Sequence, residues 1–161
     1  LVIAAMPVEA DGVRSRALQP MPMVFVGRAV AGGRRRRTLA ELCAAHELLT
    51  FQRGSQPHVA LLDLCRKQGV EAPRVHTISS ISAMVQLVEA GFGVATLPQA
   101  AVLPLAERLA LRALPCEAVL TPLPIHLSWR DDPASPVAGR VLDSVLEFNR
   151  RMPSAKKSMS A

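Results

Sequence analysis

The sequence predicts an α/β fold of two lobes with mostly parallel sheets and a cleft between the lobes. Short apolar runs of strand length alternate with amphipathic stretches of helix length, as in chains whose parallel strands are joined by helices. Half of the 161 residues are hydrophobic, which is typical of one globular domain or two small lobes. Proline-flanked segments near Leu48 and near Pro122 indicate that the chain crosses to a second lobe and later returns.

The first fifty residues are expected to form three short strands and one short helix. The stretch Val8–Gln19 is polar and carries turn chemistry at Asp11-Gly12, so we expect a loop there. Thr38 and Glu41 have the T-x-x-E spacing of a capping box, which predicts that a helix begins after Thr38. The expected strands are Leu1–Met6, Met21–Val26 and Leu48–Phe51.

A longer helix is expected over Gln56–Gln68, followed by a strand over Val75–Ile78. Ser55 is a suitable N-cap for this helix. Pro57 lies in the first helical turn, where the missing N–H of a proline costs little. Gly69 stands where the helix is expected to end.

The segment Ile78–Pro98 has the most informative pattern in the chain. Its apolar residues recur with the spacing of one helical face, and the side chains that share this face are Ile81, Met84, Val85 and Val88. Ser79 or Ser80 is the expected cap, and Gly91 stands where the helix must end in a left-handed conformation. Val94–Leu97 is short and apolar, which predicts a strand covered on both faces.

Beyond Pro98 the pattern is mixed until the last helix. It predicts a short helix over Leu103–Arg108, strand pieces near Leu111 and Val119, and a strand over Ile125–Trp129. A final helix has an apolar stripe whose members are Val137, Val141, Val145 and Phe148. Residues 153–161 are small, polar and basic, and we expect a disordered tail there.

The positive charge of the chain is concentrated in two places. The formal net charge is +6, and Arg34–Arg37 together with Lys156 and Lys157 account for all of it. The neutral remainder does not indicate a nucleic-acid-binding surface, and an aromatic content of 3% disfavours base stacking. A solvated loop is the simpler interpretation of the arginine run, and a phosphate or DNA contact is the alternative.

The sequence lacks the common patterns of catalytic, metal-binding and membrane-spanning residues. Cys43, Cys65 and Cys116 form no C-x-x-C pair and the four histidines have no i, i+4 spacing, so we expect no metal, no cofactor and no disulfide. Cys43 and Cys65 are expected to be small core residues with reduced thiols. No G-x-S-x-G elbow is present, which disfavours a nucleophilic enzyme, and no apolar run is long enough to cross a membrane.

The order of these segments, from Leu1 to about Met152, resembles the effector-binding domain of LysR-type transcriptional regulators. The most specific likeness is Gly91-Phe-Gly-Val-Ala-Thr-Leu-Pro98, which follows a serine-capped helix. Leu49-Thr-Phe-Gln-Arg-Gly-Ser55 is similar to the family's crossing into its second lobe. Leu127–Arg130 and Ser135-Pro136 resemble the return and the final helix. No single motif is diagnostic, but their order and spacing together are specific.

The resemblance implies two α/β lobes joined by two crossing strands, similar to the type II periplasmic binding proteins. Lobe 1 would comprise residues 1–47 and 123–152, and lobe 2 residues 48–122. Lobe 1 would be incomplete, and the family's N-terminal winged helix-turn-helix would lie outside this sequence, so DNA would be contacted only through that absent domain. Family members are cytoplasmic homo-oligomers without a membrane segment, which is implied here too.

The resemblance further implies that a small metabolite, such as a carboxylate, binds in the cleft. Two helix starts offer free N–H groups and a favourable dipole for an anion. At the first, Arg53 would pair with a carboxylate and Ser55 would donate a hydrogen bond. At the second, Ser79 or Ser80 matches a ligand-contacting residue of the family, and Thr96 would line the cleft floor. The structural alternatives are a surface arginine, simple helix caps and a buried strand threonine.

Three functions stay open on the sequence. The first is the effector-sensing domain of a regulator, in which a metabolite shifts the population of lobe arrangements. The second is a solute-binding lobe for transport, which would predict a secretory leader upstream. The third is a small enzyme that uses the same fold.

Overall fold

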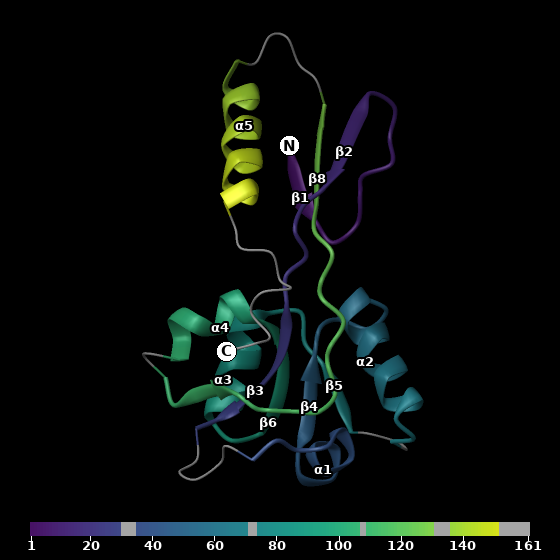
Figure 1. Ribbon diagram of the computed structural model, residues 1–161, viewed down its shortest axis with the longest axis vertical. Helices are drawn as coiled ribbons and strands as arrows, with labels where there is room; N and C mark the ends of the chain where they lie inside the picture. The colour runs from purple at the N-terminus through teal and green to yellow at the C-terminus, as the bar shows by residue number, and fades with distance from the viewer. Residues whose placement is uncertain (30–34, 71–73, 107–108, 131–135, 152–161) are drawn as a thin grey trace. The chain divides into compact units, whose positions relative to one another are not determined.

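The computed structural model describes residues 1–29, 35–70, 74–106, 109–130 and 136–151 (Figure 1). The chain forms two compact units. Unit 1 comprises Leu1–Met21 and Leu123–Ala161, and unit 2 comprises Pro22–Pro122. The chain therefore leaves unit 1 once and returns to it once. The tail expected over residues 153–161 lies outside the described residues.

The boundary after the first segment lies earlier in the chain than expected. We predicted that lobe 1 extends to residue 47, but residues 22–47 belong to unit 2. The reason is β3 (Met23–Arg28), which pairs with β6 (Gly93–Pro98) and β7 (Leu111–Ala113) in the sheet of unit 2. Because the paired residues lie 69 or more positions further along the chain, the local pattern of β3 does not reveal which sheet it joins.

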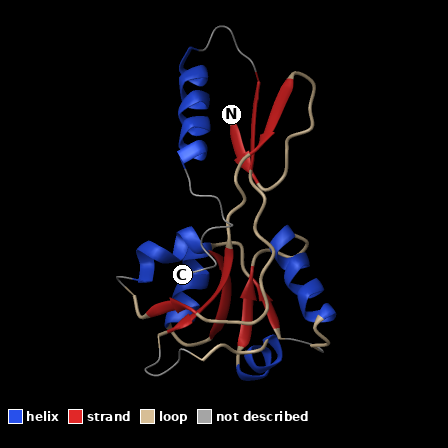
Figure 2. Ribbon diagram, in the orientation of Figure 1, coloured by secondary structure: helices blue, strands red, loops and turns tan. Residues whose placement is uncertain are grey.

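Unit 2 is built around a five-stranded sheet with the order β5-β4-β6-β3-β7 (Figure 2). β4 (Glu47–Thr50) is parallel to β5 (Val75–Thr77) on one side and to β6 on the other. β3 is antiparallel to both β6 and β7, so four strands share one direction and β3 runs against them. The expectation of a mostly parallel sheet is therefore correct for unit 2 in the sense that all of its strands except β3 run in the same direction.

The described helices of unit 2 are α1 (Leu39–Ala45), α2 (Gln56–Lys67), α3 (Ile81–Glu89) and α4 (Gln99–Ala106). The capping box predicted before α1 is confirmed, because Thr38 Oγ1 accepts from the Glu41 N–H at 3.1 Å and Glu41 Oε2 accepts from the Thr38 N–H at 2.9 Å. α4 begins at Gln99, directly after β6, and not at Leu103 as expected. Val119 lies outside any described strand.

One hydrophobic cluster of unit 2 lies between α3 and the sheet. Met84, Val85 and Val88 are buried on the helical face that their spacing predicted, whereas Ile81 in the first turn is exposed. The fully buried strand residues of this cluster are Val26, Leu49, Ala95 and Leu97. The predicted amphipathic face of α3 is thus confirmed over its last two turns.

Two glycines between α3 and β6 are required by the backbone. Gly91 has a φ of 83°, the left-handed conformation predicted for the residue that ends the helix. Gly93 allows β6 to approach β4, because a Cβ at this position would lie 2.3 Å from the carbonyl oxygen of Glu47. A side chain at Gly93 would therefore force the two strands apart.

Unit 1 has a three-stranded sheet with the order β1-β8-β2 and one described helix, α5 (Pro136–Arg151). β1 (Val2–Ala4) and β2 (Val13–Ala17) pair antiparallel with opposite edges of β8 (His126–Arg130). β2 lies in the stretch predicted to be a loop, and its polar, exposed side chains are compatible with an edge strand. The expectation of mostly parallel strands is wrong for the described sheet of unit 1.

The packing of unit 1 relies on few buried groups. Among its described residues, Leu127 is the single buried apolar side chain, at 0% exposure. Ser128 is also buried, and its hydroxyl accepts from the Val8 N–H at 3.0 Å and lies 2.7 Å from Ser15 Oγ. These polar contacts hold the segment before β2 against the centre of the sheet.

Candidate functional site

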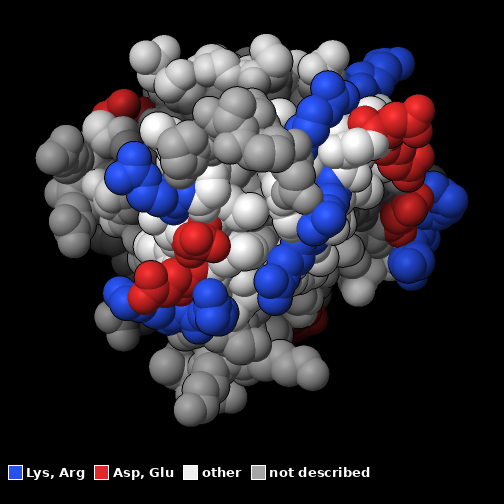
Figure 3. All heavy atoms as spheres, turned by 90° about the horizontal axis from the view of Figure 1, so that it is seen from above, with Lys and Arg blue, Asp and Glu red and all other residues white. Residues whose placement is uncertain are grey.

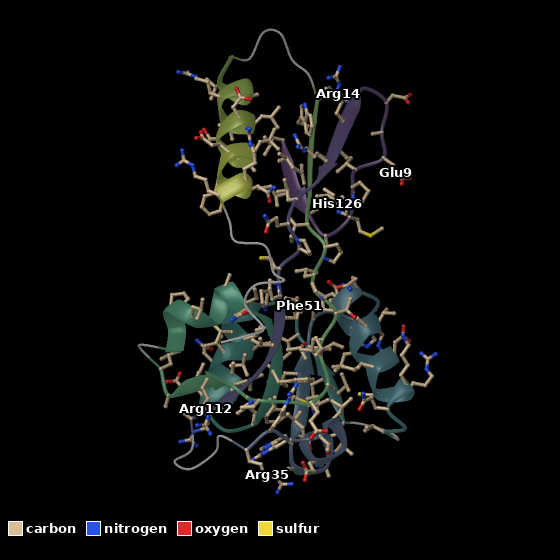
Figure 4. The ribbon with its side chains drawn as sticks, viewed as in Figure 1. Glu9, Arg14, Arg35, Phe51, Arg112 and His126 are labelled. Carbon is tan, nitrogen blue, oxygen red and sulfur yellow. The ribbon has the colours of Figure 1, made fainter. Side chains whose placement is uncertain are left out.

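Three strands of unit 2 end at the same edge of its sheet. β4, β5 and β6 run in parallel and are followed by α2, α3 and α4, so the three helices begin at this edge. Figure 4 shows Phe51, which follows β4, at this end of unit 2. Open α/β sheets bind ligands at the carboxyl ends of their strands. The structure brings the predicted residues Arg53, Ser55, Ser79 and Ser80 to this edge from two separate segments.

The turn before α2 contains polar groups without partners. Arg53 is exposed and makes no hydrogen bond or ion pair with the residues that the structure describes. Ser55 Oγ and Gln56 Oε1 are buried and also lack hydrogen-bond partners. Ser55 occupies the N-cap position, but its hydroxyl does not cap the helix. Because buried polar atoms without a partner cost free energy, this turn is suited to a polar ligand.

His58 adds a further donor to the same turn. The Gly54 N–H donates to His58 Nδ1 at 3.3 Å, which leaves the proton of the neutral imidazole on Nε2. Gly54 has a φ of 80°, so the turn that directs its N–H toward the ring requires a residue that tolerates this conformation. The turn thus offers guanidinium, hydroxyl and imidazole donors beside one amide acceptor.

At the second predicted helix start, the start of α3, one of the two serine hydroxyls already has hydrogen-bond partners. Ser80 caps α3, because its Oγ accepts from the Ala83 N–H at 3.3 Å, and it also lies 2.8 Å from Ser82 Oγ. Ser79 is exposed and has no partner among the described residues. The backbone N–H of Ile78 donates to Thr50 O at 2.8 Å, which ties this segment to the end of β4. Of the two serines, Ser79 is the one with a free hydroxyl.

Thr96 is part of the sheet interior and not of an exposed surface. It is 1% exposed, and its hydroxyl donates to Thr50 Oγ1 at 2.8 Å across β6 and β4. This arrangement favours the structural alternative given for Thr96, a buried strand threonine, because its donor is used within the sheet. The Thr50–Thr96 contact stabilises the ends of the two strands from which the candidate site begins.

The three cysteines lie near one another, which their sequence separation did not indicate. Cys43 on α1 and Cys65 on α2 are both buried, as predicted, and neighbour each other. Burial, helped by the adjacent Cys65 thiol, raises the pKa of Cys43 to about 12. Burial also raises the pKa of Cys65 and that of Cys116. Because the thiolate is the reactive form, burial disfavours nucleophilic reactivity at these thiols.

The described arginines of the basic run make contacts within unit 2. Arg35 Nη2 lies 2.6 Å from Glu41 Oε1, and Arg36 Nε donates to a backbone carbonyl at 3.2 Å. Arg37 Nη1 donates to His46 Nε2 at 2.9 Å. Figure 4 shows Arg35 at the end of unit 2 opposite to Phe51. These contacts favour a structural role for the run, away from the candidate site.

Neither the charged side chains nor the potential metal ligands of the described residues form a second candidate site. In the view of Figure 3, Lys and Arg side chains form several separate groups with Asp and Glu side chains between them. Within the described ranges, no group of three His, Cys, Asp or Glu side chains is placed to hold a metal ion. None of the described helices combines the length and apolar character needed to cross a membrane.

Comparison with known proteins identifies the family of the chain. The model of a family described as the LysR substrate binding domain matches residues 1–150. A relative from Mycobacterium leprae (strain TN), named as a probable hydrogen peroxide-inducible genes activator, is 36% identical over 101 residues. This alignment covers 60% of the chain and 32% of the relative, so the chain spans about a third of that protein's length.

Two solved structures have the same fold. The regulatory domain of CcmR from Synechocystis PCC6803, solved in complex with 2-PG, has a TM-score of 0.74 at 19% identity, over 94% of this chain and 74% of that chain. An OxyR mutant from Corynebacterium glutamicum has a TM-score of 0.63 at 26% identity, over 92% of this chain and 46% of that chain. The type II periplasmic-binding-protein-like fold class is thereby confirmed.

Proposed function

Because the chain belongs to the LysR substrate binding domain family, we propose that it is the effector-sensing part of a DNA-binding transcriptional regulator. The observation that carries this proposal is the family match over residues 1–150, which favours a regulator over a solute-binding lobe for transport. DNA is contacted by another part of the longer protein, and the whole assembly is cytoplasmic. The name of the Mycobacterium leprae relative, a genes activator, supports the same function.

We place the ligand at the turn before α2. Arg53 supplies a guanidinium that no described residue engages, and the first N–H groups of α2 add to the attraction for an anion. Ser55 and the Nε2 proton of His58 supply further donors, while Gln56 Oε1 accepts from a ligand hydroxyl or N–H. Several donors beside one acceptor fit a small carboxylate that also carries a hydroxyl group.

Ser79 is proposed as an additional contact on the neighbouring segment. Its hydroxyl is free, whereas those of Ser80 and Thr96 have partners within unit 2. Ser80 positions α3 and Thr96 supports the strand ends, so both act on the site through the backbone. That the CcmR regulatory domain holds 2-PG shows that a protein of this fold binds a small molecule.

Sensing at this site is non-covalent. Peroxide chemistry is the function suggested by the relative's name, but it requires a reactive thiolate, and burial raises the pKa of all three cysteine thiols here. Ligand binding stabilises one arrangement of the protein over another, and the ratio of the two affinities determines how far the population shifts. The chain binds its ligand and does not convert it.

Thermal unfolding of the full chain with a panel of small carboxylates, with and without hydroxyl groups, tests this function. A bound carboxylate raises the melting temperature in proportion to the logarithm of its concentration. Arg53→Ala is expected to weaken binding at least about tenfold, because it removes a charge-assisted pair.

Arg66→Ala is the matched control, because Arg66 lies in the last turn of α2 and pairs with Asp63 at 2.5 Å. It is expected to leave binding unchanged. The site is wrong if a carboxylate stabilises the wild type and Arg53→Ala equally. The proposed ligand class is wrong if no member of the panel raises the melting temperature.

A further inference from the structure

The segments of unit 2 that lead to and from the candidate site carry no carboxylate side chain near it. β4, β5 and β6 run to this edge of the sheet and α2, α3 and α4 begin there, and neither Asp nor Glu occurs in residues 48–62, 75–88 and 93–106. The acids that flank these stretches lie away from the edge, because Glu47 begins β4, Glu89 ends α3 and Asp63 lies in the second half of α2. A ligand ammonium group would find no anionic partner on these segments, and the Arg53 guanidinium would repel it.

The buried acceptor in the turn before α2 is neutral. Gln56 Oε1 is buried and has no hydrogen-bond partner, like the adjacent Ser55 Oγ. An amide oxygen accepts a hydrogen bond from a hydroxyl group, which is itself uncharged. It does not compensate the charge of an ammonium group that leaves water. The turn therefore matches an anionic ligand whose second polar group is a neutral donor.

A bound acid without a hydroxyl group would leave Gln56 Oε1 unpaired. Such a ligand also covers the turn and keeps water from the amide oxygen. Sites that hydrogen-bond a ligand hydroxyl discriminate strongly against the analogue that lacks it, because a buried polar group is then left without a partner. The same acceptor that costs free energy in the free protein thus gives the complex its selectivity.

We propose that Gln56 makes the site selective for hydroxy acids over the matching unsubstituted acids and amino acids. This inference rests on the proposed function and adds the residue that determines which carboxylate is preferred. Arg53 holds the ligand carboxylate, and the Ser55 hydroxyl donates to it. Gln56 Oε1 accepts from the ligand hydroxyl, so its hydrogen bond forms only in the complex.

Thermal unfolding of the full chain with two matched sets of acids tests this proposal. The sets are propionate, lactate and alanine, and succinate, malate and aspartate. Within each set the members differ only in whether a hydrogen atom, a hydroxyl group or an ammonium group stands beside a carboxylate. The wild type is expected to bind the hydroxy acid of at least one set at least about tenfold more tightly than the other two members.

Gln56→Met removes the acceptor and keeps the length of the side chain. The variant is expected to bind the hydroxy acid and the unsubstituted acid with affinities that differ by less than about twofold. Without ligand, it is expected to melt at the temperature of the wild type or above it, because the unpaired buried acceptor is gone. A glutamine with a purely structural role would instead lower the melting temperature when replaced and leave the preference unchanged.

Gln56→Glu places a carboxylate at the same position. It is expected to shift the preference toward the amino acid, because the ammonium group then has an anionic partner. The measured quantity is the ratio of two affinities, so a general weakening of carboxylate binding does not affect it. Gln68→Met is the matched control, because Gln68 is exposed at the opposite end of α2, and it is expected to keep the preference of the wild type.

The outcomes separate this inference from the proposed function. If no acid raises the melting temperature, both are wrong. If acids bind and Arg53→Ala weakens them, the proposed function stands. The inference about Gln56 is then overturned by a wild type that binds all three members of each set equally, or by a preference for the hydroxy acid that Gln56→Met retains.

Discussion

Unit 2 and unit 1 both combine a sheet with helices, but they differ in how much of the sheet is covered. In unit 2, consecutive residues of β6 are all buried, and neighbouring Leu48 and Leu49 of β4 are both at 0% exposure. Because successive side chains of a strand point to opposite faces, both faces of that sheet are covered. In unit 1, β1 and β2 are mostly exposed, and Leu127 is the single buried apolar residue described.

This difference indicates which unit determines the stability of the chain. Burial of apolar surface is the main favourable contribution to folding, and nearly all of it among the described residues lies in unit 2. Unit 2 is therefore expected to unfold as the cooperative core, while the described part of unit 1 contributes little apolar burial. The candidate site lies on the stable unit, which suits groups that must hold a fixed geometry for a ligand.

Gly93→Ala is the substitution expected to cause the largest loss of stability in unit 2. The new Cβ would lie 2.3 Å from the Glu47 carbonyl oxygen, and neither backbone segment is free to move. We expect unit 2 to lose more than about 4 kcal/mol of unfolding free energy, measured by urea denaturation.

Gly139→Ala on α5 is the control from unit 1, because a Cβ there meets nothing within 4 Å. It is expected to leave stability unchanged or to raise it by up to about 1 kcal/mol through helix propensity. Equal losses in the two variants would contradict the assignment of stability to unit 2.

Leu49→Ala tests the buried core directly. Leu49 is fully buried in the cluster beneath α3, so its truncation is expected to cost about 3 kcal/mol through lost burial and a residual cavity. Val141→Ala on α5, at a side chain 45% exposed, is expected to cost less than about 0.5 kcal/mol. A comparable loss from Val141→Ala would show that unit 1 has a core of its own.

His46→Gln tests a smaller, pH-dependent contribution in unit 2. Burial and the neighbouring Arg37 hold the pKa of His46 below its ordinary value, and Arg37 donates to the unprotonated Nε2. The folded state thus favours neutral His46. The contribution of this residue to the free energy of unfolding is fully present above the unfolded pKa of about 6.5, and it is lost as the pH falls through the lowered folded pKa. The loss is less than about 1 kcal/mol, because the pair is partly exposed.

The measurement is the free energy of unfolding between pH 7.5 and 5, roughly the range over which a histidine titrates. The profile of His46→Gln is expected to be flatter than that of the wild type. Glu41, whose pKa is lowered mainly by its hydrogen bond to the Thr38 backbone, is present in both proteins and does not alter the difference. Parallel profiles would show that His46 titrates alike in both states.

Local features of unit 2 were predictable because their causes lie within a few residues. The capping box at Thr38, the buried face of α3 and the left-handed Gly91 each depend on groups one or two turns apart. The likeness of Gly91–Pro98 to the family rested on the same local order, and the family match confirms it. The arginine and serines of the candidate site were found in the same way, as residues at helix starts.

Other parts of the site depended on contacts between distant segments. The sequence indicated Ser55 as a cap, but the structure leaves its hydroxyl and Gln56 Oε1 buried without partners. Thr96 finds its partner, Thr50, 46 residues away on another strand. Polar residues in the first turn after a cap were the signal that could have added Gln56 to the predicted set.

The sequence by itself determined the family and most of the helices, though not the start of α4, because hydrophobic spacing and backbone preference act within one turn. Only the tertiary structure decided that β3 joins unit 2, that β2 is a strand, and that Cys43 and Cys65 are neighbours. Strand pairing and side-chain contact join residues far apart in the chain, and their free energy depends on burial that no short stretch of sequence contains.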